Sequence, residues 1–240
     1  MSPTIEQSAT VLDSLSVLKL HGHTTLTDDE YEKLGVMAAE EVRRLCSNLS
    51  LWHPHSNHNG IEMFERKADL PYDTENMLLL IVTLPCTMEK LEALLSPWRE
   101  YRQQWDNMLE RADVIESWPE KELYLVHHLV KKMFPISARD TVDIAKVMRR
   151  TDEVTYGMTS VAHASCPPGK SHVRTHAYLG GYVLRPDDNN PNHTKFHMLF
   201  HADLNLPGPK LISNVAAKFK PKFMIQKIDN LKAGIKKFDI

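Results

Sequence analysis

Cysteine is scarce in this sequence, and the spacing of the cysteines excludes a disulfide framework. Cys46, Cys86 and Cys166 are the three cysteines among 240 residues, an odd number without a CxxC pair. Disulfide-stapled domains carry a dense, even set of cysteines and occur in oxidising compartments. We therefore expect free thiols in a reducing compartment, and a cytoplasmic protein.

Long apolar runs are also lacking. No stretch reaches the roughly 20 apolar residues that a bilayer-spanning helix needs. The first residues include Glu6 and Asp13, and they do not join a basic start to an apolar run in the manner of a secretory signal. We expect neither a membrane span nor a secretory leader.

A strong excess of charge is missing as well. Lysine and arginine total 29 against 31 aspartate and glutamate residues, a formal net charge of −2. Because nucleic-acid binding depends on a basic surface, the overall charge gives no reason to expect a nucleic-acid partner. Linkers, repeats and low-complexity stretches are also missing. We expect a single domain over residues 27–240 after a weakly structured tail, residues 1–26.

Helix signals occur at four places. Thr27 and Glu30 form a capping box, and apolar residues follow them at helical spacing. The other starts are a threonine cap, a Ser-Pro pair and a Pro-Gly-Pro sequence. The expected helices begin at Thr27, at Thr87 (through Leu95), at Ser96-Pro97 and at Pro207-Gly208-Pro209, the last with a kink at Pro221.

Most of the remaining chain is typical of strands. Runs rich in β-branched and aromatic residues alternate with turn-forming residues, as in an antiparallel meander. We interpret residues 53–60 as a turn-rich loop. A curved antiparallel sheet closed by an amphipathic helix is the natural packing of these parts, and such an α+β fold often encloses a cavity. The expected strands are residues 61–66, 77–84, 123–132, 141–149, 154–165, 173–184 and 195–204.

Several motifs, in order along the chain, resemble one family. The sequence Pro135-Ile136-Ser137-Ala138-Arg139-Asp140, preceded by Trp105-Asp106 and Val114-Ile115-Glu116, resembles the START domains, the steroidogenic-acute-regulatory-related lipid transfer family. The terminal helix resembles the family in Pro221-Lys222-Phe223. The resemblance extends from Thr27 to Phe238.

The resemblance implies a helix-grip fold, in which a U-shaped antiparallel sheet surrounds a hydrophobic tunnel and the C-terminal helix closes it. It also implies an activity. The protein would hold one lipid, such as a sterol, a ceramide, a phospholipid or another apolar molecule, and exchange it at membranes without chemical change. Neither a catalytic residue nor a metal or cofactor is expected for that activity.

The ligand-binding candidates come from two sources. Some match ligand-lining positions of the family, and the others lie on apolar faces that strand alternation or the closing helix turns inward. Ordinary core packing is the alternative for each apolar member. The candidates are His128, Val130, Thr141, Asp143, Ala145 and Met158 from the family positions, Phe196, Met198 and Phe200 from a later strand, and Val215, Phe219 and Phe223 from the helix.

His128 and Asp143 are the polar pair among these candidates. A hairpin that turns around Pro135 and Ile136 would place Val130 near Thr141 and His128 near Asp143, with both polar side chains in the tunnel. Simple patterning gives the opposite result, since it turns the apolar neighbours of Asp143 inward and leaves its carboxylate in water. Both readings stay open. The sterol-binding members resemble one another in an Arg near the position of Ala145, paired with an acid, and this sequence has neither residue.

Lysines crowd the terminal helix, where they are expected to dock the closing helix on an anionic membrane. The alternative is a solvated helix face. These lysines are Lys210, Lys218, Lys220, Lys222, Lys227, Lys232, Lys236 and Lys237.

Other functions remain as alternatives. The histidines His53, His55 and His58 in one loop, or His197 and His201 on one strand face, are conceivable metal ligands, although we expect that strand face to point outward. An enzyme on the same scaffold, such as a cyclase or hydrolase, would need an acid and a base in the cavity, and His128 with Asp143 is the pair that offers them. A lipid-gated interaction module is the third class.

Overall fold

The computed structural model describes residues 26–67, 76–134, 136–206 and 210–240, with side chains in the last range from Phe219 onward. The expected tail, residues 1–26, lies outside the described residues except for Leu26. The side chain of Val215, one of the ligand-binding candidates, also lies outside them.

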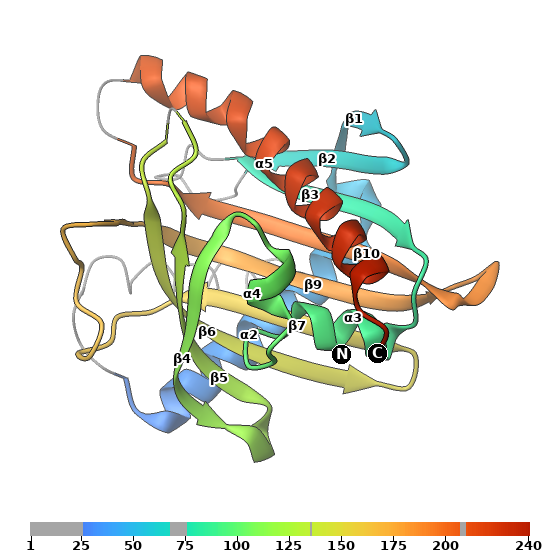
Figure 1. The fold of residues 1–240 in the computed structure, drawn as a ribbon, viewed down its shortest axis with the longest axis horizontal. Helices are drawn as coiled ribbons and strands as arrows, with labels where there is room; N and C mark the ends of the chain where they lie inside the picture. The colour runs from blue at the N-terminus through green and yellow to red at the C-terminus, as the bar shows by residue number, and fades with distance from the viewer. Residues whose placement is uncertain (1–25, 68–75, 135, 207–209) are drawn as a thin grey trace.

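The core of the structure is one curved, largely antiparallel sheet of ten strands (Figure 1). The strands are β1 (His53–His58), β2 (Ile61–Lys67), β3 (Asn76–Leu84), β4 (Leu109–Trp118), β5 (Leu123–Val130), β6 (Arg139–Arg150), β7 (Glu153–Ser160), β8 (Val173–Arg174), β9 (His176–Asp187) and β10 (Asn190–Asp203). Their order is β1-β2-β3-β10-β9-β7-β6-β5-β4, and the short β8 pairs with β6 in parallel. Figure 1 shows β4 and β5 nearly upright against β9 and β10, so the sheet curls strongly at that end.

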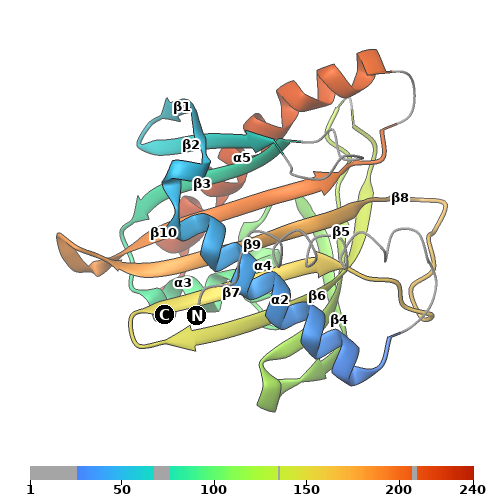
Figure 2. The same ribbon diagram turned by 180° about the vertical axis from the view of Figure 1, so that it is seen from behind.

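Helix α2 (Asp28–Ser47) covers one face of the sheet (Figure 2). The predicted capping box is confirmed, because Thr27 accepts from the Glu30 amide and the Glu30 carboxylate accepts from Thr27. The helix packs closely on β7. A Cβ at Gly157 would lie 2.1 Å from the backbone nitrogen of Ala39, so only glycine permits this approach.

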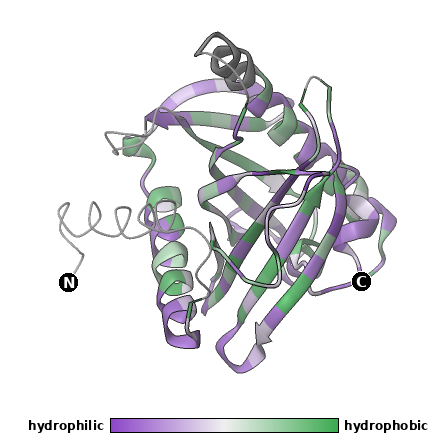
Figure 3. Cartoon of the chain, turned by 90° about the vertical axis from the view of Figure 1, so that its left-hand side faces the viewer, coloured by the Kyte–Doolittle hydropathy of each residue, from purple (hydrophilic) through white to green (hydrophobic). Residues whose placement is uncertain are grey.

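The opposite face of the sheet is covered by α5 (Lys210–Lys237) together with α3 (Met88–Leu95) and the short α4 (Arg102–Trp105). The buried side of α5 includes Met224, Ile228, Leu231 and Ile235. Helices on both faces explain why β3 is buried along most of its length instead of alternating between core and water. Figure 3 shows polar and apolar residues in alternation along other strands.

The structure differs from the prediction most at three places. Residues 53–58 form strand β1 instead of a loop, joined to β2 by a turn in which Asn59 and Gly60 have positive φ values of 51° and 79°. An Asn-Gly pair is the usual residue choice for such a hairpin turn. All six residues of β1 are exposed, so the strand lacks the hydrophobic alternation by which strands are detected.

Strand β4 is the second difference, and it was not predicted. It lies at the other edge of the sheet and carries charged residues, as edge strands often do. The third difference is the helix expected from Ser96-Pro97. Ser96 instead ends α3, because its amide and hydroxyl both donate to the Glu92 carbonyl, and only Arg102–Trp105 is helical in this stretch.

Candidate functional site

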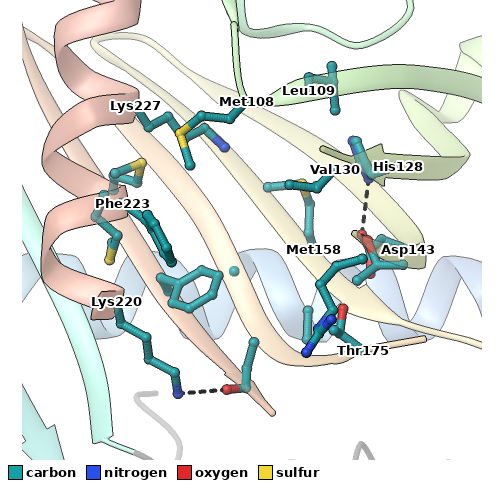
Figure 4. Close-up of a pocket in the computed structure, with 18 of the residues that line it drawn as sticks. Met108, Leu109, His128, Val130, Asp143, Met158, Thr175, Lys220, Phe223 and Lys227 are labelled. Carbon is teal, nitrogen blue, oxygen red and sulfur yellow. Dashed lines mark hydrogen bonds and ion pairs between the residues drawn. The ribbon is translucent and has the colours of Figure 1, made fainter. Parts of the chain in front are cut away.

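A cavity of about 260 Å³ lies between the inner face of the sheet and α5 (Figure 4). A cavity needs roughly 10–15 Å³ on the same measure to hold one water molecule, so this space fits a much larger guest. Most of the lining side chains are apolar. They include Met108, Leu109, Val130, Met133, Ile136, Met158, Met198, Phe200, Leu204, Phe223 and Met224.

Many of the predicted ligand-binding residues line this cavity. They come from strands that lie next to one another in the sheet and, for the last residue, from α5, which closes the space. These residues are His128, Val130, Thr141, Asp143, Met158, Met198, Phe200 and Phe223.

Ala145, Phe196 and Phe219 are absent from the cavity lining. Phe196 is fully buried and its ring lies 5.4 Å from the ring of Tyr182, so it takes the core-packing alternative. Ala145 is buried opposite Tyr124 and Met158, one strand repeat beyond Asp143. Phe219 stacks on Phe223 at 6.0 Å. Period-2 alternation chose the correct strand face for Phe196, and the family position did so for Ala145, but neither shows where along a strand the cavity ends.

His128 and Asp143 meet at the cavity wall. His128 Nδ1 lies 3.1 Å from Asp143 Oδ2, and the hydroxyls of Thr141 and Ser160 donate to the two carboxylate oxygens at 2.7 Å each. Burial alone would raise the pKa of Asp143, but the hydrogen bond and charge of His128, with the two hydroxyls, outweigh it and lower the pKa. The result is an ionised carboxylate inside the protein with several donors around it.

The alternative that left Asp143 in water is wrong. Its neighbours Val142 and Ile144 do lie inside the protein, but they pack against α2 on the other face of the sheet. Because both faces of β6 are covered, the apolar pattern did not identify the solvent side.

The predicted register of the β5–β6 hairpin is also wrong, by two residues. His128 lies opposite Thr141, Val130 lies opposite Arg139, and Met133 bridges to Ile136, so the turn centres one residue earlier than expected. A slip of two residues preserves the face of every side chain, whereas a slip of one would reverse it. His128 therefore still reaches Asp143, along the diagonal of the ladder.

A second polar cluster lies at another part of the cavity wall, and it was missed in the sequence. Arg102 and Asp106 pair at 2.9 Å, and both are almost fully buried. Tyr182 on β9 and Lys227 on α5 complete the group, and all four residues line the cavity. The sequence motif Trp105-Asp106 includes one member of the cluster, but no local signal indicates that residues from α4, β9 and α5 meet here.

The third polar feature of the cavity is a pair of cations near the end of β10. Arg139 Nε donates to the Leu204 carbonyl at 2.9 Å, and Lys220 Nζ donates to the Ala202 carbonyl at 2.9 Å (Figure 4). Both charges are therefore engaged with backbone oxygens. Lys220, counted among the membrane-docking lysines, is buried inside the protein.

The other histidine candidates have different surroundings from those expected. His197 and His201 were expected to point outward. Both are instead buried on the face of the sheet that α2 covers. Burial lowers the pKa of His197 to about 4, so its ring is neutral at physiological pH. Within the described ranges, no group of three or more His, Cys, Asp or Glu side chains is arranged to hold a metal ion.

His163 and Cys166 lie close together in the sequence, but the structure does not pair them as a base and a nucleophile. His163 contacts Ser165 at 2.7 Å and Glu116 at 3.0 Å, and not the Cys166 thiol. All three cysteines are free, which agrees with the expectation from their spacing.

The comparisons with known proteins identify the family. A model of the START domain matches residues 34–233. The chain belongs to the START domain family. The expected helix-grip arrangement, a curved antiparallel sheet closed by a C-terminal helix, is confirmed with it.

Individual START relatives are distant. Human StAR-related lipid transfer protein 6 is 24% identical over 138 residues, which are 56% of this chain and 61% of that protein. The chain thus spans about three fifths of the length of that relative. The structure of human StAR-related lipid transfer protein 5 aligns with a TM-score of 0.79 at 24% identity, over 88% of this chain and 99% of that chain. Human STARD10 aligns at 0.69 with 18% identity, over 90% and 82% of the two chains. At these identities the structures show a common fold.

Among the helices of the described residues, none has the length and hydrophobicity of a membrane span.

Proposed function

We propose that this START domain holds one lipid in the cavity under α5 and exchanges it at membranes in the cytoplasm, without covalent chemistry. The observation that carries the proposal is the cavity itself: a space of about 260 Å³ with a mainly apolar lining, between the sheet and α5. Removing hydrocarbon from water into such a space is favourable by about 25 cal/mol for each Å² of apolar surface buried. The relatives that carry "lipid transfer protein" in their names support the same reading.

The polar pair in the wall supports recognition of the ligand over catalysis. The Asp143 carboxylate already accepts from His128, Thr141 and Ser160. A general base needs a free lone pair aimed at the substrate, and here the surrounding donors lower the pKa of this carboxyl. We assign His128 the role of presenting a polar contact to the ligand, with Asp143 fixing the orientation of its ring.

Membrane contact is proposed at the end of the cavity where the β5–β6 hairpin turns. Phe134 is 96% exposed at the tip, Lys131 and Lys132 beside it are exposed, and the flanking Met133 and Ile136 line the cavity. An apolar side chain next to cations suits the interface of an anionic membrane. The hairpin tip thus marks one end through which a lipid would pass.

The lysines of α5 contribute less than their number suggested. Lys220 is buried and Lys227 lines the cavity, so neither faces a membrane. Lys222, Lys236 and Lys237 are exposed and remain available for docking the helix. The side chains of Lys210 and Lys218 lie outside the described residues. Among the other lysines, fewer face solvent than the sequence indicates.

Native mass spectrometry of the full chain purified from cells tests the proposal. We expect a population heavier than the apoprotein by the mass of one lipid, which solvent extraction should release intact. Recovery of apoprotein alone from several cell sources, with no lipid taken up from added vesicles, would contradict it. Turnover of the extracted lipid into a product would favour the enzyme alternative.

A further inference from the structure

The cluster of Arg102, Asp106, Tyr182 and Lys227 holds more positive than negative charge. Arg102 and Lys227 are cations, and Asp106 is the single carboxylate between them. Its pKa is lowered, because the charges of Arg102 and Lys227 outweigh the effect of burial, so it is ionised. With a neutral tyrosine, the cluster carries one uncompensated positive charge at the cavity wall.

Two donors in the cluster have capacity for a further acceptor. Arg102 is only 5% exposed, its Nη2 pairs with Asp106, and its Nε is buried without a hydrogen-bond partner in the described structure. Lys227 is not ion-paired with any carboxylate among the described residues. Its ammonium lies 5.8 Å from the ring centre of Tyr182 and hydrogen-bonds that side chain, which leaves further N–H donors of the ammonium for another acceptor. Figure 4 shows its side chain extending from α5 into the cavity.

The other cations of the cavity do not share this property. Arg139 donates to the carbonyls of Ser137, Ala138 and Leu204, and Lys220 donates to that of Ala202. Since an uncompensated buried charge and an unsatisfied buried donor both cost free energy, an acceptor that carries negative charge is the partner that suits Arg102 and Lys227.

We infer that the cavity binds an amphiphile with an anionic group, a carboxylate or a phosphate, and that Lys227 and Arg102 hold this anion between α5 and the sheet. This inference rests on the proposed function and names the ligand class for it. Because Lys227 is on the closing helix and Arg102 is on α4, the bound anion also ties the closing helix down over the ligand.

Calorimetric titrations of the delipidated full chain with three matched probes test the inference. Dodecanoate, dodecyl phosphate and dodecanol share one hydrocarbon chain and differ in the polar end. We expect at least one of the two anions to bind about tenfold or more tightly than dodecanol, as charge-assisted hydrogen bonds imply. The better of the two anions identifies the group as carboxylate or phosphate.

Substitutions on α5 assign the effect to Lys227. Lys227→Gln should remove most of the preference for the anion, and Lys227→Arg should retain it. Lys236→Gln is the matched control, because Lys236 is exposed on the same helix and its loss changes the net charge equally. Dodecanol binding should be the same in all variants.

The outcomes separate this inference from the proposed function. If dodecanol binds as tightly as both anions, or if Lys227→Gln keeps the preference, the anion site is refuted and the lipid cavity stands. If none of the three probes binds to the wild-type chain, the anion site is refuted, and lipid uptake from added vesicles then decides separately on the lipid cavity.

Tyr182 provides a second readout. Burial would raise its pKa, but the charges and hydrogen bonds of Lys227 and Arg102 outweigh this and lower the pKa to about 8. The groups that face it are these two cations, of which Arg102 pairs with Asp106, and Tyr156 on β7, whose ring centre lies 5.9 Å away. A bound anion should raise the tyrosinate midpoint by about one unit or more, as followed by absorbance, and Tyr182→Phe should abolish that transition. An unchanged midpoint at saturating anion would overturn the inference.

Discussion

His128 and Asp143 are joined across two neighbouring strands although they are not directly opposite in the ladder. His128 lies opposite Thr141, and its Nδ1 reaches diagonally to Asp143 Oδ2 at 3.1 Å. Thr141 itself donates to the same carboxylate oxygen. The pair therefore links β5 and β6 at the cavity wall through side chains as well as through the backbone.

Asp143→Asn tests what this network contributes to stability. Loss of charge-assisted hydrogen bonds should lower the free energy of unfolding at pH 7 by about 1.5–3 kcal/mol. The folded pKa of Asp143 is lowered, so its contribution is present above the unfolded value of about 4 and is lost as pH falls through the folded pKa. Denaturant unfolding of both proteins should thus converge in acid. A constant difference at all pH values would contradict this assignment.

His197→Leu tests the buried histidine. The folded pKa of about 4 lies below the usual value of 6.5, because burial disfavours the charged ring. Between these values the unfolded chain binds more protons, so acidification destabilises the wild type. From pH 7 to pH 5 the free energy of unfolding of the wild type should fall by on the order of 2 kcal/mol because of His197. His197→Leu should lack this contribution to the pH dependence. Urea unfolding at the two pH values measures it, and equal pH dependence would refute the assignment.

Gly157→Ala tests the contact between α2 and β7. The added Cβ would lie 2.1 Å from the backbone nitrogen of Ala39, and its nearest contacts are all backbone atoms of Ala38 and Ala39, so no flexible side chain can move aside. We expect a loss of about 3 kcal/mol or more in the free energy of unfolding, at the upper end of the cost of overpacking. Gly169→Ala, where a Cβ meets nothing within 4 Å, is the control for the substitution itself. Similar thermal midpoints for the two variants would be inconsistent with the close packing described.

Phe134→Ser tests the membrane contact at the β5–β6 hairpin. The side chain is 96% exposed, so its removal should leave stability within about 0.5 kcal/mol of the wild type. Partitioning onto anionic vesicles should weaken by about tenfold or more, because burial of a phenylalanine contributes about 1.5–3 kcal/mol. Leu49→Ser, another exposed apolar position at 45%, is the control and should bind vesicles normally. Equal vesicle binding by both variants would show that the membrane contact lies elsewhere on the protein.

Local chemistry accounts for the elements that were predicted correctly. Thr27 and Thr87 cap their helices as expected. The predicted strands appear with bounds within five residues of the prediction, except that residues 173–184 are divided between β8 and β9. The family positions placed His128 and Asp143 on the side of the sheet that faces the cavity, and the register error of two residues left them on that side.

Tertiary contacts account for what the sequence did not reveal. Arg102 and Lys227 are far apart in the chain, and only the packing of α4 and α5 on the sheet brings them to one cavity. His197 looked like an exposed polar residue because alternation predicts two faces but not a helix that covers the second one. The same limit produced the alternative that left Asp143 in water.

Lipid transfer by a cavity-filled variant tests the central claim most directly. Gly180 lines the cavity, and a Cβ there would meet only the Leu199 carbonyl, at 3.8 Å, so Gly180→Leu fills the space without displacing backbone. Gly169→Leu makes the same change at an exposed position. In a vesicle-to-vesicle assay with a lipid that the wild type carries, we expect Gly180→Leu to lose at least about tenfold in bound lipid and transfer rate while Gly169→Leu keeps both. Unimpaired binding and transfer by a folded Gly180→Leu protein would show that the lipid does not occupy this cavity.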